Sequence, residues 1–253
     1  MDLNLSGDKA DWVLDERLVQ SQKLAAIGEM SAGIAHEINN PLAIIRQEAE
    51  WMQHLLNKGS LAGDEVQELQ GSLHQVVQQV DRCTEIIRNL LDFARKREPV
   101  LQGVDLNRVI EDMTRLVERE AKHSNIEIVR QYEADLPAVH SDAPQLRQVI
   151  LNLLTNATQA IGKDGAITIT TRRTGAEAVE VEVSDTGCGI PAEDLERIFD
   201  PFFTTKPPGQ GTGLGLSICH GMIQRLGGRI TVSSQVGRGT TFTIQLPVGP
   251  TVD

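Results

Sequence analysis

The sequence predicts a helical hairpin that forms half of a dimeric four-helix bundle, followed by an α/β sandwich with helices on one face of a mixed sheet. Apolar residues recur every three or four positions over residues 16–56 and again over 64–97, which is typical of amphipathic helices. From residue 99 onward, short segments with a period of two alternate with shorter helical stretches. We therefore expect a lead-in over residues 1–15, the helical domain over 16–98 and the α/β domain over 99–253.

The composition of the 253-residue chain argues against several functional classes. A formal net charge of −11 disfavours binding to nucleic acid or to an anionic membrane surface. The three cysteines form no CxxC pair and the six histidines show no metal-ligand spacing, so neither a zinc site nor a disulfide framework is indicated. No apolar run approaches the roughly 18 residues of a membrane span, and the N-terminus lacks a signal-peptide pattern. We expect a cytoplasmic chain without membrane contact, which leaves open a longer, membrane-anchored parent.

The first helical stretch contains the segment Ser31–Leu42, with the sequence SAGIAHEINNPL. Its apolar stripe is formed by Leu24, Ile27, Ser31, Ile34, Ile38 and Ile45. At about 100° per residue, His36 points about 160° away from the nearest stripe residues, and Asn40 lies one turn further along its face. An exposed histidine on an amphipathic helix is ordinarily a surface residue. His36 is therefore a candidate functional residue only because a second, independent sequence signature for an ATP site follows later in the chain. Pro41 predicts a bend just after His36, because proline removes a backbone donor and crowds the preceding turn.

The second helical stretch follows a turn at residues 57–63, and the two stretches together predict an antiparallel hairpin. Its apolar stripe consists of Leu69, Leu73, Val76, Val80, Cys83, Ile87, Leu90 and Ala94. A hairpin with an apolar seam on each helix buries both seams poorly by itself. Two hairpins in a four-helix bundle bury them well, so we expect a homodimer. The alternative is a monomer whose second domain covers the seam.

The α/β domain is expected to contain strands at residues 125–133, 165–173, 177–184, 229–234 and 240–246. Helices are expected at 105–122, where Asp105 is the N-cap, at 142–161, and at 214–226, which ends at two glycines. Short turns separate 165–173 from 177–184 and 229–234 from 240–246, so these pairs predict two hairpins.

Two carboxamides lie one turn apart on the helix at 142–161. Asn152 and Asn156 share one face, while another face carries the apolar stripe Leu146, Val149, Ile150, Leu153 and Leu154. A carboxamide oxygen is a neutral ligand for Mg²⁺, which takes few protein ligands and keeps several waters. The alternative is an ordinary polar helix face.

Asp185 follows the strand at 177–184 and begins the segment Asp185–Pro191, with the sequence DTGCGIP. A carboxylate fixed at this point can accept a hydrogen bond from the exocyclic amino group of adenine. Gly187 and Gly189 would let the backbone approach a flat ligand closely. The alternative is an Asp-Gly turn that only connects two elements.

The glycine-rich segment 209–217 (GQGTGLGLS) leads directly into the helix at 214–226. Backbone N–H groups in such a loop and at a helix start bind phosphate oxygens. The segment is not a P-loop, because no Gly-Lys-Ser/Thr follows, and no strand immediately precedes it, as a dinucleotide fingerprint requires. The segment 199–208 (FDPFFTTKPP) suits a mobile lid that docks through its phenylalanines. Lys206 within it either reaches a phosphate or is an ordinary solvated lysine.

The order and spacing of these segments resemble the catalytic core of sensor histidine kinases of two-component signalling. His36–Leu42 (HEINNPL) is similar to the phosphoacceptor box, and Asn152–Ala157 is similar to the asparagine box. Asp185–Gly189 resembles the first glycine box, Phe199–Phe203 the phenylalanine box and Gly211–Gly215 the second glycine box. The resemblance covers about residues 18–248, and no box is missing.

The resemblance implies a dimeric histidine-bearing bundle and a Bergerat-type α/β sandwich that binds ATP with Mg²⁺. It implies that Asp185 binds adenine, that Asn156 holds Mg²⁺ and that Asn152 helps to place the phosphates. The other nucleotide contacts that it implies are Gly187, Gly189, Lys206, Gly211, Thr212, Gly213, Leu214 and Gly215.

The resemblance also implies a mechanism in which His36 attacks the γ-phosphoryl group of ATP in line. The neutral imidazole dominates near pH 7 and is a good nucleophile. Glu37 would orient the imidazole and accept its proton, while positioning and electrostatics would supply most of the catalysis. The phosphohistidine would pass its phosphoryl group to an aspartate of a response regulator. Asn40 matches the position implicated in dephosphorylating that regulator.

Three rival functions are weighed against this one, and Asn152, the His36 hairpin and the complete set of boxes argue against them. A gyrase- or MutL-like ATPase places a glutamate where Asn152 stands, and that residue activates water. A serine kinase of the anti-sigma type would lack the hairpin that carries His36. A dimeric scaffold would bind nucleotide without chemistry, and formation of acid-labile, base-stable phosphoprotein separates a kinase from such a scaffold.

Overall fold

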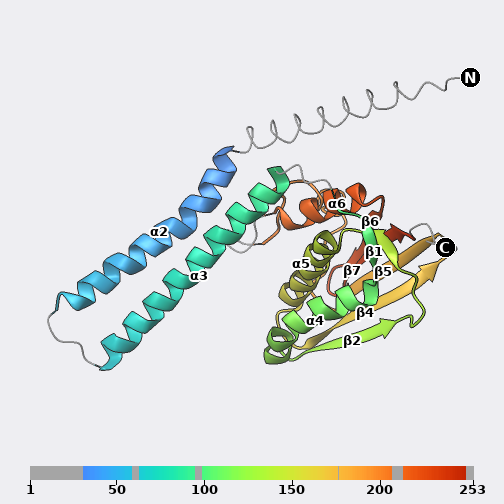
Figure 1. The fold of residues 1–253 in the computed structure, drawn as a ribbon. Coiled ribbons are helices and arrows are strands. Elements are labelled where there is room, and N and C mark those ends of the chain that lie inside the picture. Colours follow the sequence, from blue (N-terminus) through green and yellow to red (C-terminus); the bar gives the residue numbers. More distant parts are fainter. Residues whose placement is uncertain (1–30, 59–62, 95–98, 176, 207–212, 249–253) are drawn as a thin grey trace, which may run out of the picture. The chain divides into compact units, whose positions relative to one another are not determined.

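The computed structural model describes residues 31–58, 63–94, 99–175, 177–206 and 213–248. These residues fall into two compact units, a helical hairpin and an α/β unit (Figure 1), and each is described by itself. The predicted hairpin and mixed α/β fold are therefore confirmed, whereas the pairing of two hairpins stays a prediction. The lead-in over residues 1–15 and the expected beginning of the first helix at residue 16 lie outside the described residues.

The hairpin consists of α2 (Ser31–Leu56) and α3 (Gly63–Ala94), which lie side by side (Figure 1). α2 remains an α-helix through Pro41, so the bend expected there stays a prediction. Leu55 on α2 and Ile86 on α3 are almost fully buried. Lys58, just after α2, donates from Nζ to Oε1 of Glu65 in the first turn of α3 at 3.0 Å. This ion pair joins the two helices next to the connecting turn.

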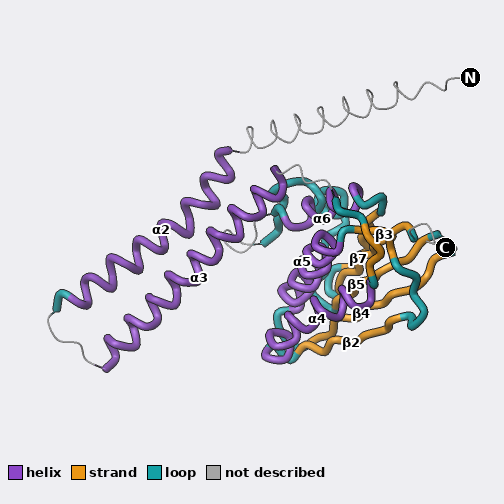
Figure 2. The backbone as a smooth tube through the Cα atoms, in the orientation of Figure 1, coloured by secondary structure: helices purple, strands orange, loops and turns teal. Residues whose placement is uncertain are grey.

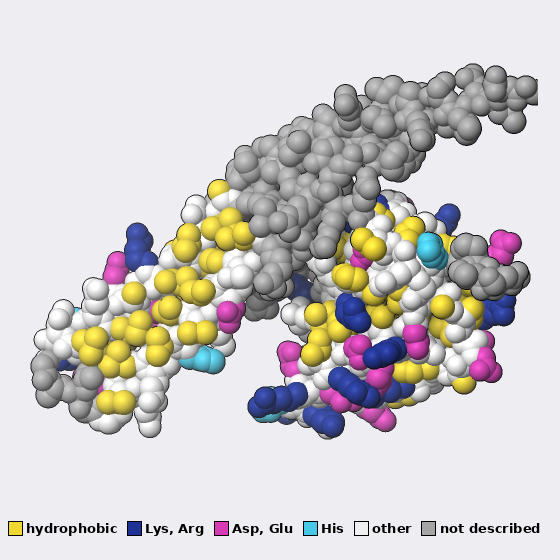
Figure 3. All heavy atoms as spheres, viewed as in Figure 1, with side chains coloured by type: hydrophobic (Ala, Val, Ile, Leu, Met, Phe, Trp, Pro, Cys, Tyr) yellow, Lys and Arg dark blue, Asp and Glu magenta, His cyan; other side chains and the backbone are white. Residues whose placement is uncertain are grey.

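The apolar stripe of α3 divides into two faces. Stripe residues at one position of a seven-residue repeat are half-buried: Leu69, Val76 and Cys83. Those at another position of the repeat are 56%, 47% and 46% exposed: Leu73, Val80 and Ile87. Figure 3 shows hydrophobic side chains gathered along the hairpin. The stripe that we predicted as one seam is therefore split, as in a heptad repeat with one position packed inside the hairpin and one facing outward.

The α/β unit contains a five-stranded sheet with the strand order β2-β4-β5-β7-β6. Its strands are β2 (Ile126–Tyr132), β4 (Gly165–Thr174), β5 (Ala178–Asp185), β6 (Arg229–Gln235) and β7 (Gly239–Pro247). β2 and β4 are parallel, and the other neighbouring strands are antiparallel, so the sheet is mixed as predicted. The predicted hairpins β4–β5 and β6–β7 are both confirmed.

The helices α4 (Leu106–His123), α5 (Ala143–Ile161) and α6 (Gly215–Arg225) cover one face of this sheet (Figure 1, Figure 2). Asp105 accepts the N–H group of Arg108 at 3.0 Å, which confirms it as the N-cap of α4. Asp142 caps α5 in the same way through the N–H group of Gln145 at 2.9 Å. The core between helices and sheet is aliphatic, and its fully buried members include Ile110, Ile150, Leu153, Leu154, Ile167 and Ile169.

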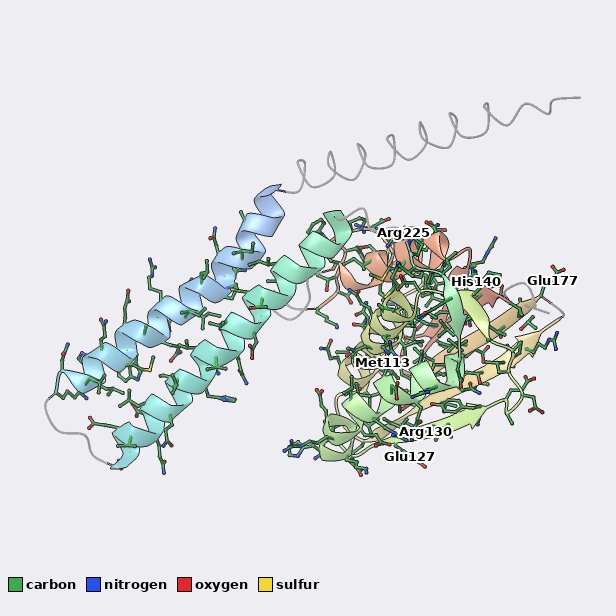
Figure 4. All side chains as sticks on the ribbon, in the orientation of Figure 1. Met113, Glu127, Arg130, His140, Glu177 and Arg225 are labelled. Carbon is green, nitrogen blue, oxygen red and sulfur yellow. The ribbon has the colours of Figure 1, made fainter. Side chains whose placement is uncertain are left out.

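An ion-pair network fastens the edge strand β2 to α4. Arg130 on β2, labelled in Figure 4, donates from Nε to Glu111 at 2.8 Å and from Nη2 to Glu118 at 2.5 Å. The hydrogen bond from Arg130 holds the pKa of Glu111 below its usual value, and the same bond raises the pKa of Arg130. Both glutamates belong to α4, so the helix is attached to the edge strand by charge as well as by apolar packing.

Two short strands depart from the prediction. β1 (Gln102–Val104) pairs antiparallel with β3 (Val139–Ser141) in a separate two-stranded sheet. The N–H group of Val100, just before β1, donates to Oδ2 of Asp142 at 2.9 Å. The segment that enters the α/β unit is thus attached to the start of α5.

Among the described helices, none has both the length and the apolar composition needed to cross a membrane.

Candidate nucleotide-binding site

One face of α5 carries Asn152, Asn156 and Ala160, which are spaced by four residues and lie one turn apart. Asn156 donates from Nδ2 to Oδ1 of Asn152 at 3.5 Å. Another side of the helix is buried in the core, where Leu153 and Leu154 are at most 1% exposed. The structure therefore places the two carboxamides side by side on the polar side of a firmly packed helix.

α6 begins against the first of these residues. A Cβ on Gly215 would lie 2.8 Å from both Oδ1 and Nδ2 of Asn152, so a larger residue would displace the carboxamide. One turn later on α6, the sulfur of Cys219 accepts from Nδ2 of Asn152 at 3.0 Å. Burial raises the pKa of Cys219 to about 12, so its thiol is neutral near pH 7. Asn152 is thus held between α6 and Asn156.

The segment that follows β5 packs on the other end of the same face. The N–H group of Cys188 donates to the carbonyl oxygen of Ala160 at 3.1 Å. A Cβ on Gly187 would lie 2.6 Å from the carbonyl carbon of Ala160, and one on Gly189 would lie 2.2 Å from the carbonyl oxygen of Gln235. We predicted these glycines for the close approach of a ligand. The structure gives a second reason for glycine at these two positions, because the backbone there already packs against other backbone atoms of the protein.

Asp185, the last residue of β5, is 6% exposed. Its Oδ1 accepts the N–H groups of Gly187 at 2.8 Å and of Thr240 at 3.3 Å. Burial raises the pKa of Asp185 above its usual value, and the two N–H groups partly offset this shift. Within the described residues Oδ2 makes no hydrogen bond. The carboxylate therefore has one oxygen fixed by the protein and one that can accept a hydrogen bond from a ligand.

In the segment between β5 and α6, Phe202 contacts Gly213, which lies just before α6. The N–H group of Phe202 donates to the carbonyl oxygen of Gly213 at 2.9 Å, and a Cβ on Gly213 would lie 2.3 Å from the carbonyl carbon of Phe202. Phe199 stacks on His220 of α6 with ring centroids 5.1 Å apart. The base of the predicted lid is thus attached to α6. The middle of the lid at 207–212, with Gly211 and Thr212, lies outside the described residues.

The N-terminal end of α6 has the properties of an anion site. Its N-cap residue is Leu214, whose side chain offers no acceptor to the first N–H groups of the helix. Gly213, directly before it, has a φ of 63°. N–H groups at the positive end of a helix dipole are a general phosphate-binding device. This helix end lies against Asn152 through Gly215, so a phosphate there would be next to the carboxamides of α5.

Two family models match the chain in succession. The His Kinase A (phospho-acceptor) domain matches residues 26–99. The model of histidine kinase-, DNA gyrase B- and HSP90-like ATPases matches residues 141–250. The nucleotide-free catalytic domain of histidine kinase ThkA is 35% identical, with a TM-score of 0.54, and the match covers 59% of this chain and 99% of that domain. The chain belongs to the sensor histidine kinase family.

Other relatives extend the similarity to the hairpin. Sensor histidine kinase ZraS of Escherichia coli K12 is 38% identical over 243 residues, which cover 94% of this chain and 49% of ZraS. The chain therefore spans about half the length of the curated relatives that it matches. A crystal structure of ThkA in complex with the response regulator protein TrrA is 28% identical, with a TM-score of 0.77, and the match covers 100% of this chain and 70% of that one. The ATPase model covers most of the α/β unit, which identifies this unit as the ATP-binding part of the kinase.

The other predicted site residues of this histidine kinase lie outside α5, β5 and α6. His36, Glu37 and Asn40 belong to α2, and Asn40 is exposed. Lys206 is half-buried and ends the described segment before residues 207–212. The structure thus brings Asn152, Asn156, Asp185 and the start of α6 together within the α/β unit. Lys206 does not belong to that unit, and the phosphoacceptor residues lie on the helical unit.

Sequence reasoning missed the residues on either side of the β6–β7 turn. Thr240 of β7 donates its N–H group to Asp185, and Ser234 of β6 donates to the carbonyl oxygen of Gly239. Gly239 has a φ of 113°, and a Cβ there would lie 1.8 Å from the carbonyl oxygen of Asp185. Gly237 and Gly239 could have pointed to this contact with Asp185, but a hairpin turn alone is enough to explain glycines at these positions.

We expect Gly239→Ala to destabilise the α/β unit by about 3–5 kcal/mol and to abolish ATP binding. The added Cβ would collide with backbone, which cannot rotate away, at a φ that only glycine adopts readily. Gly237 in the same turn has a φ of 75° and no atom within 4 Å of an added Cβ, so Gly237→Ala should cost about 1 kcal/mol. Urea unfolding followed by circular dichroism compares the variants, and equal losses would contradict this account.

Proposed function

We propose that this histidine kinase transfers the γ-phosphoryl group of ATP to His36 and then to an aspartate of a response regulator. The observation that carries the proposal is the succession, on one chain, of a phosphoacceptor hairpin and an ATP-binding unit. Autophosphorylation requires these two parts, a side-chain nucleophile and a site that positions the nucleotide. The α/β unit supports the second part, because its polar residues converge along one face of α5.

The nucleotide would lie along α5, with its base at Asp185 and its phosphates at the start of α6. Oδ1 of Asp185 is occupied by two backbone N–H groups, so Oδ2 would accept the amino proton of adenine. The first N–H groups of α6 would bind phosphate oxygens. The residues that would contribute there are Asn152, Lys206, Gly211, Thr212, Gly213, Leu214 and Gly215. Gly187 and Gly189 would shape the base pocket through the backbone packing described above.

Mg²⁺ fits the carboxamide of Asn156. An amide oxygen is a hard, neutral donor, and Mg²⁺ usually takes one or two protein ligands alongside phosphate oxygens and water. Nδ2 of Asn156 donates to Asn152, so Oδ1 is the atom that would hold the metal. The ion would neutralise charge on the phosphates when bound.

His36 would act as the nucleophile on the γ-phosphorus. The attacking imidazole nitrogen forms an N–P bond while the bond to the bridging oxygen breaks, and ADP leaves with that electron pair. Glu37, the next residue along α2, would accept the proton that the imidazole gives up. The product is a phosphoramidate, which is labile in acid and stable in base.

A response regulator is the partner that best fits this chemistry. ThkA, which aligns with the whole of this chain, was crystallised in complex with the response regulator protein TrrA. Asn40 is exposed one turn after His36, where its carboxamide would position a water molecule against a regulator's phosphoaspartate.

We expect Asn40→Ala to slow regulator dephosphorylation about 100-fold, because the attacking water loses its orienting group. The substrate is a receiver domain chosen because it rapidly accepts label from this kinase. Phosphate release from the labelled receiver domain is measured with wild type and variant. An unchanged rate would remove the phosphatase role from Asn40.

The hairpin supports a homodimer. Its outward-facing apolar residues on α3 are 42–56% exposed: Val66, Leu73, Val77, Val80 and Ile87. A second hairpin would cover this stripe in a four-helix bundle and remove it from water. The alternative is a monomer in which the stripe is covered by another part of the protein.

Labelling with γ-labelled ATP and Mg²⁺ tests the proposal. We expect protein-bound label that is lost in acid and retained in base. A gyrase-like ATPase would release labelled phosphate without labelling itself, and it would carry a carboxylate where Asn152 stands. ATP binding without any label would instead indicate a state locked in the absence of its stimulus or a nucleotide-binding scaffold, and regulator dephosphorylation would then separate these two.

A further inference from the structure

The helix-facing side of the main sheet changes from apolar to polar in its last row. One row across β4, β5, β7 and β6 consists of Ile169, Val183, Phe242 and Val232. The next row toward the end of β5 consists of Ile167, Asp185, Thr240 and Ser234. Directly opposed residues in neighbouring strands have side chains in contact distance. Polar groups at three of these four positions therefore form one connected set around the carboxylate of Asp185.

Ser234 uses all of its hydrogen-bonding capacity within this set. Its hydroxyl donates to the carbonyl oxygen of Gly239 at 2.8 Å. Its oxygen accepts the N–H group of Ile190 at 2.8 Å and lies 2.9 Å from the hydroxyl of Thr240. A serine hydroxyl has one proton and two acceptor positions, and with its proton on Gly239 it accepts from both other groups. One half-buried side chain thus joins three backbone or side-chain groups.

These bonds hold the two segments that surround Asp185. Ile190 belongs to the loop that follows Asp185, and that loop is also tied to the β6–β7 turn by the bond from Gly237 N–H to Cys188 at 2.8 Å. Gly239 and Thr240 are the first residues of β7, directly after the turn, and Thr240 donates its N–H group to Oδ1 of Asp185. Loss of the Ser234 hydroxyl would remove the bonds to Ile190 and Gly239 and would leave the loop and the β6–β7 hairpin joined more weakly on either side of the carboxylate.

We propose that Ser234 is a positioning residue for nucleotide binding, which fixes the carboxylate of Asp185 in the orientation that accepts the amino group of adenine. The inference rests on the proposed function, in which Asp185 binds the base. A buried carboxylate that is held by preformed N–H bonds pays no reorganisation when the ligand arrives. Without the Ser234 hydroxyl, the start of β7 and the loop at Ile190 are held by fewer hydrogen bonds, so the two oxygens of Asp185 are less tightly oriented.

The test measures autophosphorylation rate against ATP concentration for Ser234→Ala and for Ser233→Ala. Ser233 is the exposed neighbour on the same strand and is the matched control. We expect Ser234→Ala to raise KM for ATP about tenfold and to leave the maximal rate within about twofold, because the base is remote from the transferred phosphoryl group. Ser234→Thr keeps the hydroxyl and should restore KM. Ser233→Ala should match wild type.

If Ser234 only stabilised the fold, the Ser234→Ala variant would give a different pattern. Its melting temperature would fall, and its maximal rate would fall because a smaller fraction is folded, while KM for ATP would stay unchanged. That result would overturn the proposal. Ser234→Cys fills the same space with a weaker donor and acceptor, and it provides the same comparison if Ser234→Ala does not fold. Equal KM values for the Ser234 and Ser233 variants would also overturn it. Wild-type protein that fails to bind ATP would instead refute the proposed function.

Discussion

Replacement of His36 by glutamine is expected to abolish the acid-labile label completely. Glutamine fills a similar space on α2 and forms hydrogen bonds, but its amide nitrogen is not nucleophilic, so no phosphoramidate can form. ATP binding should be unchanged, because Asn152, Asn156 and Asp185 belong to the α/β unit, which is a different unit from the hairpin that carries His36. Incubation with γ-labelled ATP and Mg²⁺, followed by acid and base treatment, measures the label.

The matched control for this variant is His54→Gln on the same helix. His54 is exposed and stacks on Trp51 with ring centroids 5.5 Å apart, so it is a surface histidine with a structural contact of its own. The control should label as wild type does. Label that persists in His36→Gln and disappears in His54→Gln would move the phosphoacceptor to the other end of α2.

The elements that could be predicted are those whose pattern spans many residues. β4 and β5 contain 10 and 8 residues, so their period of two is visible, and α5 has both an apolar stripe and the cap Asp142. β1 and β3 contain 3 residues each, which is too short for a periodic signal. They pair only because the packed core brings distant segments together, and sequence patterns carry little information on such contacts.

The same distinction between local and distant contacts applies to the candidate site. Asp185 was predictable because a strand end and two glycines lie within a few residues of it. Thr240, which donates to its carboxylate, is 55 residues further along the chain and becomes a neighbour only through the pairing of β5 with β7. Gly187 illustrates a further limit, since close ligand approach and close backbone packing both require the absence of a Cβ and look identical in sequence.

Asp185→Asn is expected to weaken ATP binding about 100-fold while the fold stays intact. The amide oxygen of asparagine can accept the N–H groups of Gly187 and Thr240 as Oδ1 does, so its NH₂ group would take the position of Oδ2. An NH₂ group is a donor and would face the amino group of adenine, which is also a donor. Calorimetric titration with ATP measures the loss. Inosine triphosphate carries an oxygen in place of that amino group, so its affinity should fall less or even rise.

The stability of Asp185→Asn should not fall together with its affinity. Burial raises the pKa of Asp185, so the folded protein holds this proton more tightly than the unfolded chain does, and the contribution of this group to stability is lost as pH rises through the raised pKa. The variant has no charge to bury, and at pH 7 its unfolding free energy should equal or exceed that of wild type. Asp135→Asn, on the exposed turn after β2, is the control and should bind ATP normally. Loss of affinity with a parallel loss of stability would show that Asp185 supports the fold rather than the base, whereas unchanged affinity would remove it from base recognition.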